Sequence, residues 1–202
     1  MFSKRFSHLL IFVISPAILI YITILSFALK EGIEPHLVTR DLIQTCKLPI
    51  AYGMLSNLGI LLWAAAAGIT FFASQSALIQ NKSIKNYLTI GSIFTSILCI
   101  DDLFLLHDFF IEEKALYLIY ALMAFYLLLS SRQQDLRAHS YSFFIAAMLL
   151  GLSIICDKLQ GRIAISYSDL QVFEEGFKFI GIACWLYYWW QASLTAIKSR
   201  AG

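Results

Sequence analysis

The run PIAYGMLSNLGILLWAAAAGITFFAS, residues 49–74, contains no charged side chain. A helix crosses the hydrocarbon core of a bilayer with roughly 20 predominantly apolar residues, so this run is long enough to span a membrane. Its apolar residues are continuous, whereas the strands of membrane barrels need alternating segments of about 10 residues. The run therefore predicts a transmembrane α-helix.

The rest of the sequence has the same character. The 202 residues are 59% hydrophobic and only 14% charged, which is not the composition of a soluble domain. About six apolar runs approach the length of a membrane span: residues 8–29, 49–74, 86–106, 115–131, 141–158 and 169–192. The fourth and fifth are short, so counts of five or seven spans stay open. We predict an all-α, polytopic integral membrane protein of the plasma or inner membrane, in which residues 1–202 form a single transmembrane domain.

The basic residues predict how the spans are oriented. With six spans, both termini and two of the loops lie on one side of the membrane. That side carries eight basic residues against one acid, Asp135; the basic residues are Lys4, Arg5, Lys82, Lys85, Arg132, Arg137, Lys198 and Arg200. Cytoplasmic loops are enriched in lysine and arginine, so we expect both termini in the cytoplasm.

The acidic residues predict where a polar site lies. The stretch CIDDLFLLHDFFIEEK, residues 99–114, ends the third span, CDK, residues 156–158, ends the fifth, and DLQVFEEGFKF, residues 169–179, begins the sixth. All three segments lie toward the non-cytoplasmic side in this topology. Connectivity alone therefore brings seven ionisable residues to a similar depth in one half of the bilayer: Asp101, Asp102, Asp108, Asp157, Glu174, Glu175 and Lys178.

Helical geometry refines this cluster. At about 100° per residue, Asp101 and Asp108 fall in one narrow stripe of the third helix, and His107 points away from it. Lys178 follows Glu174 by four residues, the favourable order for an ion pair within a helix. Charged groups at membrane depth cost about 2.5–3.5 kcal/mol each on insertion scales, so we expect the cluster to face the interior of the bundle. For Asp108 the alternative is a solvated helix end.

The excess of carboxylates predicts ion binding. One lysine cannot neutralise them all, so the surplus must be protonated, hydrated or bound to cations. Carboxylates suit calcium, magnesium or manganese, and a histidine widens the choice of divalent metal ion to zinc or iron. The candidate metal ligands are Asp101, Asp102, Glu174, Glu175, His107, Asp108 and Asp157. Lys178 competes for these carboxylates as an ion-pair or gating residue, and a purely structural salt-bridge network is the alternative.

Other polar and aromatic side chains have less specific roles. Asn57, Tyr117 and Tyr120 fall in the same half of the bilayer and are candidates to line the site, with hydrogen bonding in the core as the alternative. The third span carries a small-residue face, including Ser92 and Thr95, that suits helix packing. The sequence WLYYWW, residues 185–190, predicts an aromatic belt at the membrane surface.

These features support three hypotheses for function. The first is a small membrane protein that binds and moves a cation or proton through a site open to the non-cytoplasmic side, with a homo-oligomer supplying the path that the inner half lacks. The alternative is a metal-dependent membrane enzyme that acts on a lipid or other apolar substrate. The third is a non-catalytic subunit of a membrane complex. The lipid bilayer is an expected partner, and no basic face for nucleic acid is present.

Overall fold

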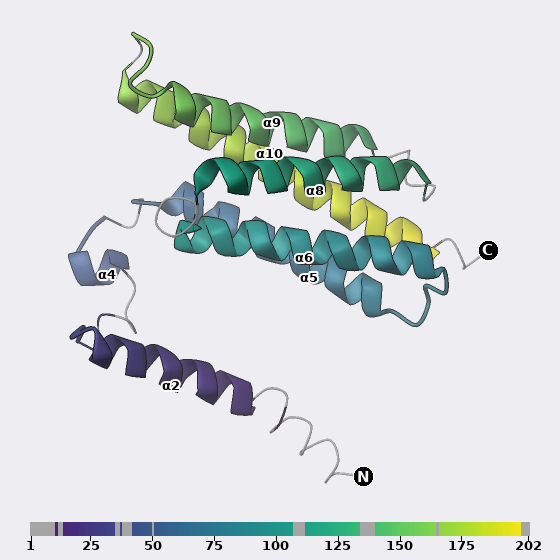
Figure 1. Cartoon of the computed structure of the whole chain (residues 1–202), viewed down its shortest axis with the longest axis horizontal. Helices are drawn as coiled ribbons and strands as arrows, with labels where there is room; N and C mark the ends of the chain where they lie inside the picture. The colour runs from purple at the N-terminus through teal and green to yellow at the C-terminus, as the bar shows by residue number, and fades with distance from the viewer. Residues whose placement is uncertain are drawn as a thin grey trace. The chain divides into compact units, whose positions relative to one another are not determined.

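The computed structural model describes residues 11, 14–34, 37, 42–49, 51–106, 112–133, 140–164 and 166–198. Within these ranges every regular element is a helix (Figure 1). The chain divides into two compact units, Met1–Met54 and Leu55–Gly202. The all-helical prediction is therefore confirmed for the described residues, while the prediction of a single domain stays a prediction.

The first unit holds two described helices, α2 (Ser15–Lys30) and α4 (Leu42–Cys46). Pro16 lies in the first turn of α2, where its missing N–H would have no partner within the helix. At the other end, Glu31 donates its N–H to the Phe27 carbonyl at 3.0 Å, and the next residue, Gly32, has a φ of +69°. The helix thus ends one residue beyond the predicted first span.

The second unit is built from five long helices: α5 (Met54–Gln75), α6 (Lys82–Phe104), α8 (Glu113–Gln133), α9 (Ser140–Leu159) and α10 (Tyr167–Lys198). Among the described helices, four are long and apolar enough to cross a membrane, namely α5, α6, α9 and residues Lys114–Ser131 of α8. They coincide with the second to fifth predicted spans. The chain is therefore consistent with a membrane protein, and α10 covers the predicted sixth span with one continuous helix of 32 residues.

Local backbone and side-chain contacts explain where α6 begins and where it ends. The side chain of Asn81 caps the start by accepting hydrogen bonds from the N–H groups of Ser83 and Ile84, at 2.9 and 3.3 Å. At the other end Leu105 adopts a left-handed conformation, with φ +51°, and its N–H donates to the Asp101 carbonyl. The helix α6 ends at Phe104, and Asp108, the other residue of the predicted stripe, lies outside the described residues.

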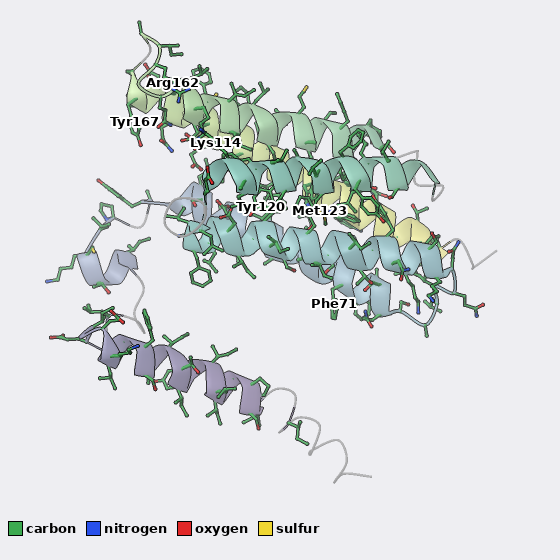
Figure 2. All side chains as sticks on the ribbon, in the orientation of Figure 1. Phe71, Lys114, Tyr120, Met123, Arg162 and Tyr167 are labelled. Atoms are coloured by element: carbon green, nitrogen blue, oxygen red, sulfur yellow. The ribbon has the colours of Figure 1, made fainter. Side chains whose placement is uncertain are left out.

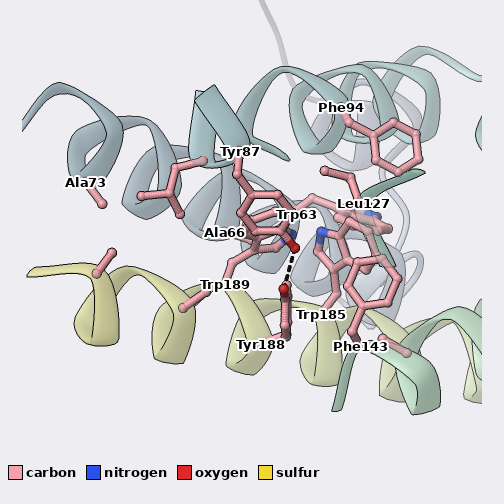
Figure 3. Close-up of a cluster of buried hydrophobic side chains, with 14 of the residues drawn as sticks. Trp63, Ala66, Ala73, Tyr87, Phe94, Leu127, Phe143, Trp185, Tyr188 and Trp189 are labelled. Carbon is pink, nitrogen blue, oxygen red and sulfur yellow. Dashed lines mark hydrogen bonds between the residues drawn. The ribbon is translucent and has the colours of Figure 1, made fainter. Parts of the chain in front are cut away.

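The core of the second unit is organised around aromatic side chains of α10 (Figure 3). Trp185 lies with its ring centroid 6.0 Å from Trp63 of α5, 5.9 Å from Phe94 of α6 and 5.0 Å from Phe143 of α9. Its exposed fraction is 1%. One side chain therefore contacts three neighbouring helices, and α9 and α10 also pack along their lengths.

The predicted aromatic belt is wrong for three of its residues. Trp185, Tyr188 and Trp189 are buried inside the protein, while Tyr187 and Trp190 are 42% and 51% exposed. The buried positions recur with helical spacing, so one face of α10 points into the bundle and the other points outward. Composition alone cannot separate these two faces, because both are aromatic.

Polar contacts between helices accompany this packing. Trp185 Nε1 donates to Thr95 Oγ1 of α6 at 2.9 Å, and the hydroxyls of Tyr87 and Tyr188 are hydrogen bonded (Figure 3). On the small-residue face of α6, Ser92 Oγ donates to the Ala67 carbonyl of α5 at 3.1 Å. Lipid tails are as apolar as the side chains, so close packing and hydrogen bonds hold such helices together. The small-residue face serves helix packing, as predicted.

Gly91 of α6 lies directly against the side chain of Trp189. A Cβ atom built at this position would lie 2.0 Å from the ring of Trp189. We expect Gly91→Ala to lower the free energy of unfolding by about 1–3 kcal/mol, because the indole has to shift within a filled core. Gly68→Ala is the matched control, since a Cβ there meets no atom within 4 Å. Thermal unfolding in detergent measures both, and equal midpoints for the two variants would contradict the packing described.

Candidate functional site

The second unit encloses a cavity of about 780 Å³, open on one side, whose wall comes mainly from α6, α8, α9 and α10. Its two ends differ in chemistry. Most of the polar residues gather at one end: Asp101, Asp102, Tyr117, Tyr120, Asp157, Gln160, Gln171, Glu174, Glu175 and Lys178. The other end is aromatic and aliphatic, with Trp63, Phe94, Phe143 and Trp185 among its residues. The cavity is therefore amphipathic.

The structure brings most of the predicted site residues together. Of the residues named from sequence, eight line this one cavity: Asp101, Asp102, Asp157, Glu174, Glu175, Lys178, Tyr117 and Tyr120. They come from four helices, and Figure 2 shows Tyr120 between α8 and α6. The inference that connectivity gathers the ends of the third, fifth and sixth spans is thus supported by their placement.

A buried ion pair joins α6 to α10 at the polar end. Lys178 Nζ lies 2.5 Å from Asp102 Oδ1 and 3.9 Å from Glu175 Oε1. The Asp102 side chain is only 8% exposed and that of Lys178 is 23% exposed. Ion pairs removed from water need additional hydrogen bonds to offset the cost of desolvation. This pair ties the two helices together, as the structural alternative predicted.

The second oxygen of Asp102 lacks such compensation. Asp102 Oδ2 is buried and has no hydrogen-bond partner among the described residues. A buried acceptor without a donor costs roughly 1–3 kcal/mol, and more when it is charged. Asp102 lines the cavity, but this oxygen is itself buried and is not part of the accessible wall.

Glu174 is held by an amide. Gln160 Nε2 donates to Glu174 Oε2 at 2.6 Å and lies 3.3 Å from Gln171 Oε1. The ion pair expected between Glu174 and Lys178 is therefore replaced by contacts of Lys178 with Asp102 and Glu175. The sequence interpretation missed both glutamines. Gln171 precedes Glu174 by three residues and so lies on the same helix face, a signal that could have identified it.

A second lysine balances part of the charge. Lys158 Nζ lies 3.3 Å from Asp157 Oδ2, and the two side chains are 39% and 38% exposed. The same ammonium lies 5.7 Å from the centroid of the Tyr117 ring, within the range of a cation–π contact. Lys158 itself does not line the cavity, and Lys178 is the one cationic side chain among the described residues that do.

Other predicted residues lie elsewhere. Asn57 is exposed on α5 and is not part of the cavity wall. His107 and Asp108 fall outside the described residues. Among the residues that are described, no group of three or more His, Cys, Asp or Glu side chains is arranged to hold a metal ion. The predicted divalent metal site stays a prediction.

The chain was also compared with known proteins. Residues 12–192 match the family described as "Domain of unknown function (DUF8692)". No curated protein and no solved structure matches the chain.

Replacing Lys178 tests the ion pair. We expect Lys178→Met to lower the free energy of unfolding by about 2–5 kcal/mol, because Asp102 is left buried without a counter-charge. Lys158→Met is the matched control, expected at about 0–1 kcal/mol because its pair with Asp157 is more exposed. The double variant Asp102→Asn with Lys178→Met should recover most of the loss. Unfolding in detergent reports all three, and a loss for Lys158→Met as large as that for Lys178→Met would rule out the asymmetry.

Proposed function

The chain belongs to that family of domains of unknown function, and we propose that it is a multi-pass membrane protein that binds a cation at the polar end of its cavity. One observation carries the proposal: five carboxylates of three helices line a single cavity, and the described lysines that pair with them are only Lys178 and, outside the cavity wall, Lys158. The carboxylates are Asp101, Asp102, Asp157, Glu174 and Glu175. A bound cation would offset the repulsion among them.

The kind of cation follows from the charges and the side chains at the polar end of the cavity. The energy between two charges scales with their product, so a divalent ion would double both its repulsion from Lys178 and its attraction to the carboxylates. Charge therefore does not select the valence of the ion. The rings of Tyr117 and Tyr120, which line the same end, favour an organic ammonium-type cation, because the faces of aromatic rings attract such groups.

The aromatic end of the cavity is closed, which favours a site that binds a cation over an open channel that conducts it. Trp185 fills the floor in contact with Trp63, Phe94 and Phe143, and all four side chains line the cavity. An ion cannot pass through these rings without displacing them. Transport of the bound cation, the fuller form of the hypothesis, therefore requires these rings to move or a path that avoids them.

The apolar part of the cavity favours a second candidate, a membrane enzyme acting on a lipid or other apolar substrate. Its carboxylates would act in general acid–base chemistry or hold a divalent metal. Manganese and zinc therefore belong among the cations to be tested.

We further propose the complete topology of six spans, with α2 and α10 completing the four apolar helices and both termini in the cytoplasm. The short loops supply the argument, since lysine and arginine gather at the cytoplasmic ends of spans. In this arrangement the polar end of the cavity faces the opposite side.

Cation binding is tested by titrating the purified protein with methylammonium, sodium, calcium, manganese and zinc while following tryptophan fluorescence, because Trp63 and Trp185 line the cavity. We expect saturable methylammonium binding that is weakened about tenfold or more in Asp102→Asn and in Glu174→Gln. Glu174→Gln leaves the pair of Lys178 with Asp102 intact. The control is Asp169→Asn, an exposed carboxylate of α10 outside the cavity wall.

Two outcomes would count against this proposal. In the first, none of the cations binds. In the second, the carboxylate variants bind as well as the control does. Binding of zinc or manganese alone, lost in the same variants, would instead favour the enzyme.

Orientation is tested with single cysteines in a background from which Cys46, Cys99, Cys156 and Cys184 have been removed. Ala164→Cys, between α9 and α10, should react with a membrane-impermeant maleimide on intact cells, because that loop is expected outside. Lys82→Cys, at the start of α6, should react only after permeabilisation. The reverse pattern would invert the topology, and both wild-type positions are exposed in the structure.

A further inference from the structure

The cavity is far larger and more apolar than a small cation needs. We propose that the bound cation is the head of an amphiphile: a protonated amine carried on an apolar chain and lacking a phosphate group. This inference rests on the proposed cation site and names the class of molecule that fills it. An amphiphile would fill both the polar and the apolar end of the cavity, whereas a small cation would occupy only the polar end.

Size supports an organic occupant. The volume of about 780 Å³ falls within the roughly 300–1,000 Å³ typical of sites for small organic molecules. Beyond the carboxylates the wall is formed by side chains such as Phe94, Leu98, Phe143 and Met148. Water gains few hydrogen bonds against such a wall, so an apolar chain is the better match for this space.

Charge supports an amine without phosphate. Five carboxylates line the cavity, and Lys178 is the one cationic side chain among the described residues that line it. An N–H cation supplies these carboxylates with both hydrogen-bond donors and positive charge. A phosphate on the same head would bring one or two negative charges among five carboxylates, where Lys178 alone could attract it.

Small side chains leave the room that a chain requires. Ala121 and Ala124 of α8, together with Ala147 and Gly151 of α9, line the cavity beside the aromatic rings. A Cβ built on Gly151 meets no atom within 4 Å, so a larger side chain at this position would enter open space and not the packed core. The position is therefore suited to filling the cavity selectively.

The experiment uses the full chain in phosphatidylcholine nanodiscs. The probe is dodecylammonium carrying a bromine at the end of its chain, which quenches tryptophan fluorescence if the tail reaches the floor of the cavity. Unlabelled methylammonium, dodecylammonium, dodecanoate and dodecylphosphocholine then compete with the probe. All variants are compared in the same bilayer, so the amount of probe that dissolves in the lipid is the same for each of them.

We expect dodecylammonium to displace the probe at about one-tenth of the methylammonium concentration or less, because its methylenes are buried. Dodecanoate and dodecylphosphocholine should not compete. Gly151→Leu should weaken dodecylammonium binding about tenfold and leave methylammonium binding unchanged. Gly68→Leu, at an open position outside this cavity, should change neither. Glu174→Gln should weaken both amines.

The outcomes separate this inference from the proposed function. If methylammonium competes as well as dodecylammonium, or if Gly151→Leu has no effect on the long-chain amine, the cation site stands and the amphiphile is wrong. If dodecanoate or dodecylphosphocholine competes equally, the head group is not recognised as proposed and the amine is wrong. If no amine binds, both proposals fail.

Discussion

The contacts of Trp185 are the constraint on which the second unit depends. Its ring touches α5, α6 and α9 at once, and its N–H donates to Thr95. In a membrane, burying an indole against protein gains little over burying it against lipid, so the geometry of these rings and the hydrogen bond must hold the helices together. The same ring forms the floor of the cavity. One side chain therefore contributes to both the packing of the helices and the geometry of the site.

The helix α10 also fixes the depth of the cavity. Lys178 stands at the polar end and Trp185 at the floor, seven residues apart on one helix, which corresponds to about 10 Å along its axis. The ion pair with Asp102 and the hydrogen bond to Thr95 both anchor α10 to α6, one at each end of this span. The two ends of the cavity are thus held at a set separation by a pair of polar contacts between the same two helices.

Apolar length predicted four helices of this protein well, and six of the seven residues that connectivity brought together line one cavity. Other features need tertiary information. The buried and exposed faces of WLYYWW are equally aromatic, and the end of α6 depends on Leu105 adopting a conformation that leucine rarely takes. The pairing of Glu174 with Gln160 likewise depends on the loop that turns α9 back toward α10. Sequence spacing carries information within one helix, and these contacts lie between helices or beyond a helix end.

The helix α8 contacts α6 and α9 at few positions, one of them the contact of Tyr120 with Phe94, whereas α9 and α10 pack along their lengths. A sideways displacement of α8 would therefore break few contacts between helices. If the helices span a bilayer as proposed, this displacement would open the cavity within the plane of the membrane, and an apolar ligand could enter it sideways without first passing through water.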